Sequence, residues 1–182
     1  MAISREDAAA ALREIDRAVD RSNDLRGYHI AGPVLMVWGI VWLLGYGGMG
    51  LLAPSRWGAL WLLLDLLGLI GTIAMLRRVR TTNARRWRPL LIALAIVIFI
   101  AATYWVFRPL PRDGIVVFPA LVCGLAYMIT GAFRLTRFVW IGGAILVASL
   151  IGFCFFRPWL CFWMAGVGGL GLFMGGLWMR KA

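Results

Sequence analysis

The sequence predicts an all-α membrane protein: a six-transmembrane-helix bundle built as three hairpins, with an N-terminal amphipathic helix in the cytoplasm. The chain of 182 residues is 62% hydrophobic and only 15% charged, whereas about a quarter of the residues in a soluble domain are charged. Its apolar residues gather into six runs of about 20 residues each, the length that a helix needs to cross a bilayer. After the first 26 residues, its basic residues lie in the short gaps between these runs and in the tail, where they determine membrane topology.

The first segment, residues 1–27, is predicted to be a cytoplasmic helix outside the membrane. Ser4 can cap a helix that begins there, and Ser22-Asn23-Asp24 is expected to end it. Residues 1–26 hold five Arg and six acidic residues, unlike the basic polar face of a helix that lies on a membrane. Its single apolar stripe therefore predicts contact with a protein helix: the chain's own inner loops, a second copy or another protein. The stripe consists of Ala8, Leu12, Ile15 and Val19.

The second predicted domain, residues 28–182, contains the six apolar runs. None has a polar stripe wide enough to face water, which argues against a soluble helical protein. The runs are His29–Ala53, Trp57–Leu76, Pro89–Phe107, Gly114–Phe133, Phe138–Phe156 and Pro158–Met179.

The distribution of basic residues predicts the orientation. The first, third and fifth gaps hold four of them, and the other fifteen lie in the N-terminal segment, the second and fourth gaps and the tail. Because Lys and Arg favour the cytoplasmic side, both termini are expected inside. The net charge of +11 is explained by this topology, so we expect membrane lipid and no nucleic acid as a partner.

Three predicted outer turns resemble one another. Each has a Pro and an Arg beside aromatic residues, at residues 53–57, 107–111 and 156–159. They indicate either a repeated two-helix unit or convergence, because outer turns favour Pro and interfaces favour Arg and Trp.

Asp65 is the only acidic residue within the predicted runs. A carboxyl group at this depth costs on the order of 3 kcal/mol, so we expect it to face the bundle interior. Counted from Ser55, Tyr46 and Asp65 lie at about the same depth, which predicts a hydrogen bond between them. Thr72 follows two turns later on the same helix face and extends this polar site.

Two interpretations of Asp65 remain open. It can bind a proton or cation during transport, or it can be a neutral carboxyl group that joins helices through hydrogen bonds. No Lys or Arg lies at a similar depth, so an ion pair within one subunit is not expected.

The last run is rich in glycine. Gly171 and Gly175 form a GxxxG pattern, which Ala165 and Gly169 extend. Such faces let helix backbones approach closely. The contact is either within the bundle or between subunits, so an oligomer is one expectation.

No feature of the sequence indicates catalysis, and we expect neither a cofactor nor a metal. His29 is the single histidine, and the spans carry no nucleophile motif or paired carboxylates. Cys123, Cys154 and Cys161 form no C-x-x-C motif. They are expected to be apolar packing residues, with a Cys154–Cys161 disulfide across the last turn as the alternative.

The glycine-rich hairpins with a proline in an outer turn, as in Trp38-Gly39-Ile40-Val41-Trp42 leading to Ala53-Pro54, resemble those of HdeD-like acid-resistance membrane proteins. The resemblance covers roughly residues 30–179 and implies a small six-span protein of the bacterial inner membrane. It implies no site residue. The function expected is therefore non-enzymatic and based on helix contacts, in stress response or regulation of a partner; the alternative is a proton- or cation-coupled transporter that uses Asp65.

Overall fold

The computed structural model describes residues 5–78, 88–109, 111–133 and 135–181, and only their backbone at 5–10, 20, 23, 24, 26, 78 and 88–90. Within these ranges the chain forms helices and turns and no strand. The main helices are α1 (Arg5–Leu51), α2 (Trp57–Arg78), α4 (Arg88–Val106), α5 (Arg112–Phe133), α6 (Arg137–Phe155), α7 (Leu160–Trp163) and α8 (Gly171–Arg180). The π-helical segment η3 (Met164–Leu170) joins α7 to α8.

Within the described residues, five helices are long and apolar enough to cross a membrane. They span Gly27–Leu51, Pro54–Arg77, Arg112–Phe133, Arg137–Phe155 and Arg157–Arg180. A shorter apolar stretch covers Leu91–Val106 in α4. Many large apolar side chains on these helices are exposed, as expected where hydrocarbon is the solvent. An all-α, membrane-type bundle is therefore confirmed.

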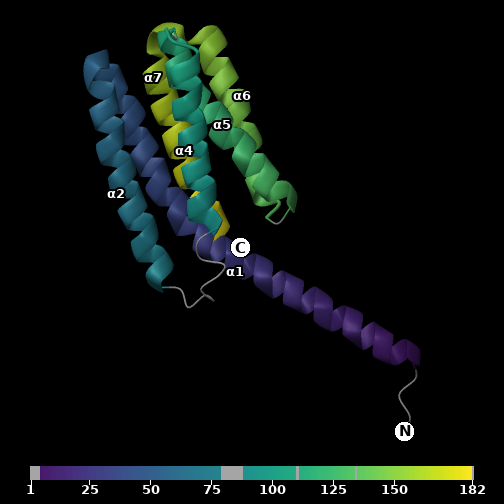
Figure 1. Cartoon of the computed structure of the whole chain (residues 1–182). Helices are drawn as coiled ribbons and strands as arrows, with labels where there is room; N and C mark the ends of the chain where they lie inside the picture. The colour runs from purple at the N-terminus through teal and green to yellow at the C-terminus, as the bar shows by residue number, and fades with distance from the viewer. Residues whose placement is uncertain (1–4, 79–87, 110, 134, 182) are drawn as a thin grey trace.

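The first helix differs from its prediction. The helix does not end at Ser22-Asn23-Asp24, because α1 is a single helix of 47 residues. These three residues weaken a helix only slightly. A helix held in the bundle at one end extends through such positions at little cost, since only its nucleation is costly. Figure 1 shows the N-terminal half of α1 projecting from the end of the bundle at which the C-terminus also lies.

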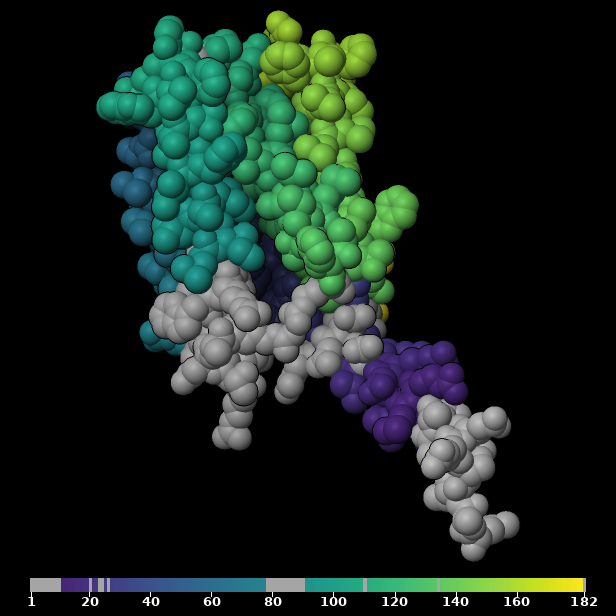
Figure 2. Space-filling view, turned by 45° about the vertical axis from the view of Figure 1, so that its right-hand side comes forward, coloured from purple at the N-terminus to yellow at the C-terminus, as the bar shows by residue number. Residues whose placement is uncertain are grey.

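The packing is centred on α1, which contacts α2, α7, η3 and α8. The closest pairs are α5 with α6 and α1 with α8, whereas α4 contacts α5 sparsely. Figure 2 shows a furrow between α4 and the pair α5–α6. Neighbours in the predicted hairpins are therefore not always the closest packed helices.

Two of the proline turns contain short 3₁₀ helices. Pro54–Arg56 separates α1 from α2, and Arg157–Trp159 separates α6 from α7. The first closes with a hydrogen bond of 2.9 Å from the Arg56 amide to the Ala53 carbonyl. Pro supplies the φ angle that begins such a turn and offers no amide to leave without an acceptor.

Candidate functional site

The predicted polar site lies where α1 packs on α2. Thr72, on α2, is buried and fully satisfied: its hydroxyl donates to the Gly68 carbonyl at 2.8 Å and accepts from the Trp38 indole N–H at 3.2 Å. Because the hydroxyl bonds its own helix and the neighbouring one, it joins α1 to α2. This arrangement leaves it little capacity to carry a proton or an ion.

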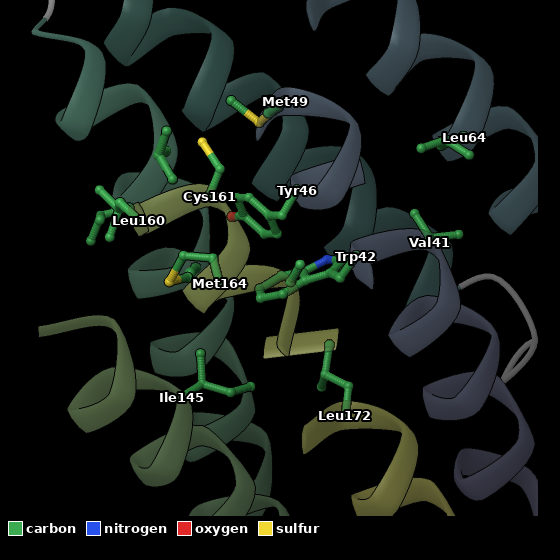
Figure 3. Packing of buried hydrophobic residues seen from close by; sticks show 14 of the residues in the cluster. Val41, Trp42, Tyr46, Met49, Leu64, Ile145, Leu160, Cys161, Met164 and Leu172 are labelled. Atoms are coloured by element: carbon green, nitrogen blue, oxygen red, sulfur yellow. The ribbon is translucent and has the colours of Figure 1, made fainter. Parts of the chain in front are cut away.

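Tyr46 lies at the centre of the core, with only 1% of its surface exposed. The rings of Trp42 and Trp61 meet it edge to face, with centroids 5.5 Å and 5.2 Å away. Figure 3 shows its hydroxyl oxygen directed to the side of Cys161 and Met164. Among the described residues, that hydroxyl has no hydrogen-bond partner, which is uncommon for a buried tyrosine.

The predicted hydrogen bond between Tyr46 and Asp65 is absent. The prediction took Ser55 as the middle of the turn. In the structure the ring of Tyr46 lies against that of Trp61, which places the middle one to two residues earlier, near Ala53. Asp65 follows Trp61 by four residues and so lies about one helical turn, ~5 Å, further along α2.

Asp65 is half-buried beside the stripe of α2 that faces α1. Its neighbours along α2, Leu64 and Gly68, are buried. Among the described residues, no hydrogen bond or ion pair to it is found. Asp65 and Tyr46 are consequently two polar groups close to the interior without a bonded partner.

The predicted small-residue face of the last span is divided. A Cβ on Gly169 would lie 2.7 Å from the Leu43 backbone of α1, and one on Gly175 would meet Ile141 and Leu35 from 3.0 Å. Ala165 is buried as well. A Cβ on Gly171, by contrast, would meet nothing within 4 Å. Gly171 and Gly175 therefore do not form one contact face.

Sequence reasoning missed a second glycine pattern. Gly32 and Gly39 on α1 lie against α8 and η3, where Gly169 and Gly176 approach them closely. Gly32 and Gly39 are seven residues apart, and so are Gly169 and Gly176. A spacing of seven residues returns to nearly the same helix face after two turns. This heptad spacing was visible in the sequence and would have identified the antiparallel contact of α1 with α8.

The apolar stripe of the projecting helix is uncovered in the described structure. Leu12, Ile15 and Val19 are 62%, 58% and 52% exposed. The side chain of Ala8 lies outside the described residues, as do residues 79–87. The described part of the chain therefore supplies no cover for these three side chains.

Two other features bear on chemistry. The cysteines are free, with Cys154 exposed and Cys161 buried, so the two are not bridged. Within the described residues, no three His, Cys, Asp or Glu side chains gather as a metal site would require.

Comparisons with protein-family models, curated proteins and solved structures found no match.

Proposed function

We propose that this chain is a membrane-anchored docking module. In this proposal it crosses the inner membrane six times, with both termini in the cytoplasm, and acts through helix contacts without catalysis. The uneven distribution of basic residues supports the orientation. The apolar stretch Leu91–Val106 within α4 supports a sixth crossing beside the five longer spans.

The observation that carries the proposal is the exposed stripe on a continuous helix. Water surrounds the first half of α1 in this topology, and three large apolar side chains in one row are unfavourable there. Because the helix continues into the bundle without a break, a partner bound to residues 4–24 is connected rigidly to the first span. The module would thus anchor or regulate a partner at the cytoplasmic surface.

The stripe fits another helix rather than a membrane surface. Apolar residues at spacings of three and four form a narrow seam, which is the geometry of helix pairing. The flanking charges are nearly balanced, so they attract neither anionic lipid nor a strongly charged protein. We expect the partner to be a helix of another protein; a second copy of the chain is the alternative.

Photo-cross-linking in cells tests the proposal. A photoreactive amino acid at Ile15, on the stripe, should give one protein adduct, whereas the same group at Arg17, on the opposite face, should not. The substitutions Leu12→Ser, Ile15→Ser and Val19→Ser should abolish partner co-purification. The matched control set, Glu14→Ser, Arg17→Ser and Arg21→Ser, should retain it. Equal adducts from both faces would contradict a stripe-specific contact, and an adduct of twice the chain mass would identify a second copy.

A second candidate function is supported by Asp65. The residue is half-buried, and among the described residues its carboxyl group has no bonded partner. A proton- or cation-coupled transporter requires such a group. Asp65→Asn keeps the size of the side chain but removes its titration. The variant is placed in liposomes that contain a pH-sensitive dye. If Asp65 is the carrier, its proton flux should be at least tenfold lower than that of the unaltered protein, and unchanged flux would exclude this role.

The resemblance to HdeD-like proteins stays a prediction. It suggests acid stress as a condition for the experiment in cells. A deletion strain should then lose acid survival, and the triple stripe variant should fail to restore it.

A further inference from the structure

A groove on the lipid-facing side of the bundle is unrelated to the polar site and to the projecting stripe. It has a volume of about 300 Å³ and runs between α6 and the segment formed by η3 and α8. This volume is at the lower end of the range for small-molecule sites. Its walls are apolar and come from Trp140, Ala144, Ile145, Val167, Gly171 and Trp178.

The groove exists because a small residue lies on each of its two walls, which leaves the space between them unfilled. Gly171 has no side chain, and the space beside it is open, since a Cβ there would meet nothing within 4 Å. Ala144 lines the opposite wall. Val167 belongs to the π-helical segment, and such wide turns occur frequently at functional sites. All of these residues lie within candidate spans, so the groove opens to hydrocarbon.

One end of the groove has two aromatic residues and two cations. Trp140 and Trp178 are 71% and 45% exposed and lie in the first turn of α6 and the last turn of α8, which the bond from Arg137 to the Trp178 carbonyl joins. Arg137 precedes Trp140 by one helical turn on α6, and Lys181 follows Trp178 by one turn. Both basic residues are therefore placed beyond the aromatic pair, at headgroup level.

Arg137 is held in place by its neighbours. Its Nη1 donates to the Trp178 carbonyl at 2.8 Å, and its guanidinium lies 4.7 Å from the Trp178 ring and 5.1 Å from the Tyr28 ring. A guanidinium has five N–H donors, so several remain for an anion. Because the side chain is already ordered, an anion that binds there loses little affinity to ordering it.

We propose that this groove binds one acyl chain of an anionic phospholipid, whose phosphate contacts Arg137 and Lys181. The apolar walls match the chain, the tryptophans lie at the depth of the glycerol backbone, and the two cations match the headgroup charge. Zwitterionic lipid offers the same acyl chain without the net charge, so it should bind more weakly.

Native mass spectrometry of the full chain in mild detergent tests this proposal. Phosphatidylglycerol and phosphatidylcholine with identical acyl chains are the probes. We expect one phosphatidylglycerol to bind roughly tenfold more tightly than phosphatidylcholine, in line with the attraction between basic residues and anionic lipid. Lys181→Gln should reduce that preference by about threefold to fivefold. Equal binding of the two lipids would overturn the proposal.

Two glycine variants locate the site. Gly171→Leu fills the groove and should lower phosphatidylglycerol binding by about tenfold, because it occupies the space of the acyl chain. Gly143→Leu is the matched control: its Cβ also meets nothing within 4 Å, and it does not line the groove. Size-exclusion profiles and circular dichroism check that both variants fold. Equal affinity in the two variants would overturn the assignment to this groove.

Discussion

Two hydroxyl groups at the contact of α1 with α2 differ sharply in their surroundings. Thr72 accepts from Trp38 and donates to Gly68, so its bonding is complete. Tyr46 is more deeply buried, but no described residue bonds its hydroxyl. A satisfied hydroxyl contributes to helix association, whereas a buried, unsatisfied one costs about 1–3 kcal/mol. These two residues therefore predict opposite effects of removing a hydroxyl.

Thr72→Val should destabilise the bundle. Valine has nearly the same shape but leaves the indole N–H of Trp38 without an acceptor. We expect a loss of about 1 kcal/mol, within the range measured for hydrogen bonds between membrane helices. Unfolding by SDS titration measures it. Thr72→Ser keeps the hydroxyl and serves as the control; a valine variant as stable as the serine variant would contradict the assigned bond.

Tyr46→Phe should leave stability unchanged or raise it by up to about 1 kcal/mol. The aromatic contacts with Trp42 and Trp61 are retained, and only the unsatisfied hydroxyl is removed. The same SDS titration applies. A loss of more than about 1 kcal/mol would show that the hydroxyl has a partner in the membrane.

At the scale of helices, glycine decides which surfaces approach most closely. Gly39 on α1 and Gly142 on α6 both lie against the backbone of a neighbouring helix. Gly143, next along the chain, faces open space. In a bilayer, close backbone contact of this kind replaces the hydrophobic effect as the source of helix association. The position of each glycine therefore matters more for helix association than the number of glycines.

Gly39→Ala should destabilise the contact of α1 with α8. The added Cβ would lie 2.7 Å from the Phe173 amide nitrogen and 2.8 Å from the Gly169 carbonyl oxygen, so the backbones must separate. Overpacking of this kind costs about 1–3 kcal/mol. Gly143→Ala should be neutral or stabilising, since alanine favours a helix. Thermal melts in detergent compare the two, and an equal effect would contradict the close approach.

The elements were largely predictable because a bilayer constrains them strongly. Hydropathy located the apolar runs, and the prolines located the turns near Pro54 and Pro158. The continuity of α1 was not predictable, because Ser22-Asn23-Asp24 resembles a helix end when tertiary support is unknown. The Tyr46–Asp65 bond was wrong because depth was counted from a turn whose centre was assigned one to two residues too late.

Ala18→Pro tests whether the continuity of α1 matters. Ala18 is exposed in the projecting half, so proline there breaks the helix without touching the bundle. We expect partner cross-linking from Ile15 to fall at least fivefold while the melting temperature stays unchanged. Ala18→Ser is the control at the same position. Full cross-linking in the proline variant would show that the stripe acts as a flexible tether.

The arrangement of the whole molecule constrains the number of crossings. Each crossing moves the chain to the opposite side, so two termini at one end of the bundle require an even number. Figure 1 shows the C-terminus at the end from which α1 projects. The described residues contain five spans that meet the length criterion, which is odd. We therefore propose α4 as the sixth crossing; its 19 residues extend about 28 Å as a helix.

Cysteine labelling tests this count. Single cysteines at Ala18, Ser55 and Thr136, in a chain whose three native cysteines are replaced by alanine, are treated with a membrane-impermeant thiol reagent. Six crossings predict that intact cells label only Ser55→Cys, because Ala18 and Thr136 are then cytoplasmic. If α4 failed to cross, α5 would begin on the opposite side and intact cells would label Thr136→Cys. That result would place Arg137 and Lys181, which two crossings separate, together on the outer side, opposite the projecting half of α1. Labelling of Ala18→Cys in intact cells would contradict the cytoplasmic position on which the docking proposal depends.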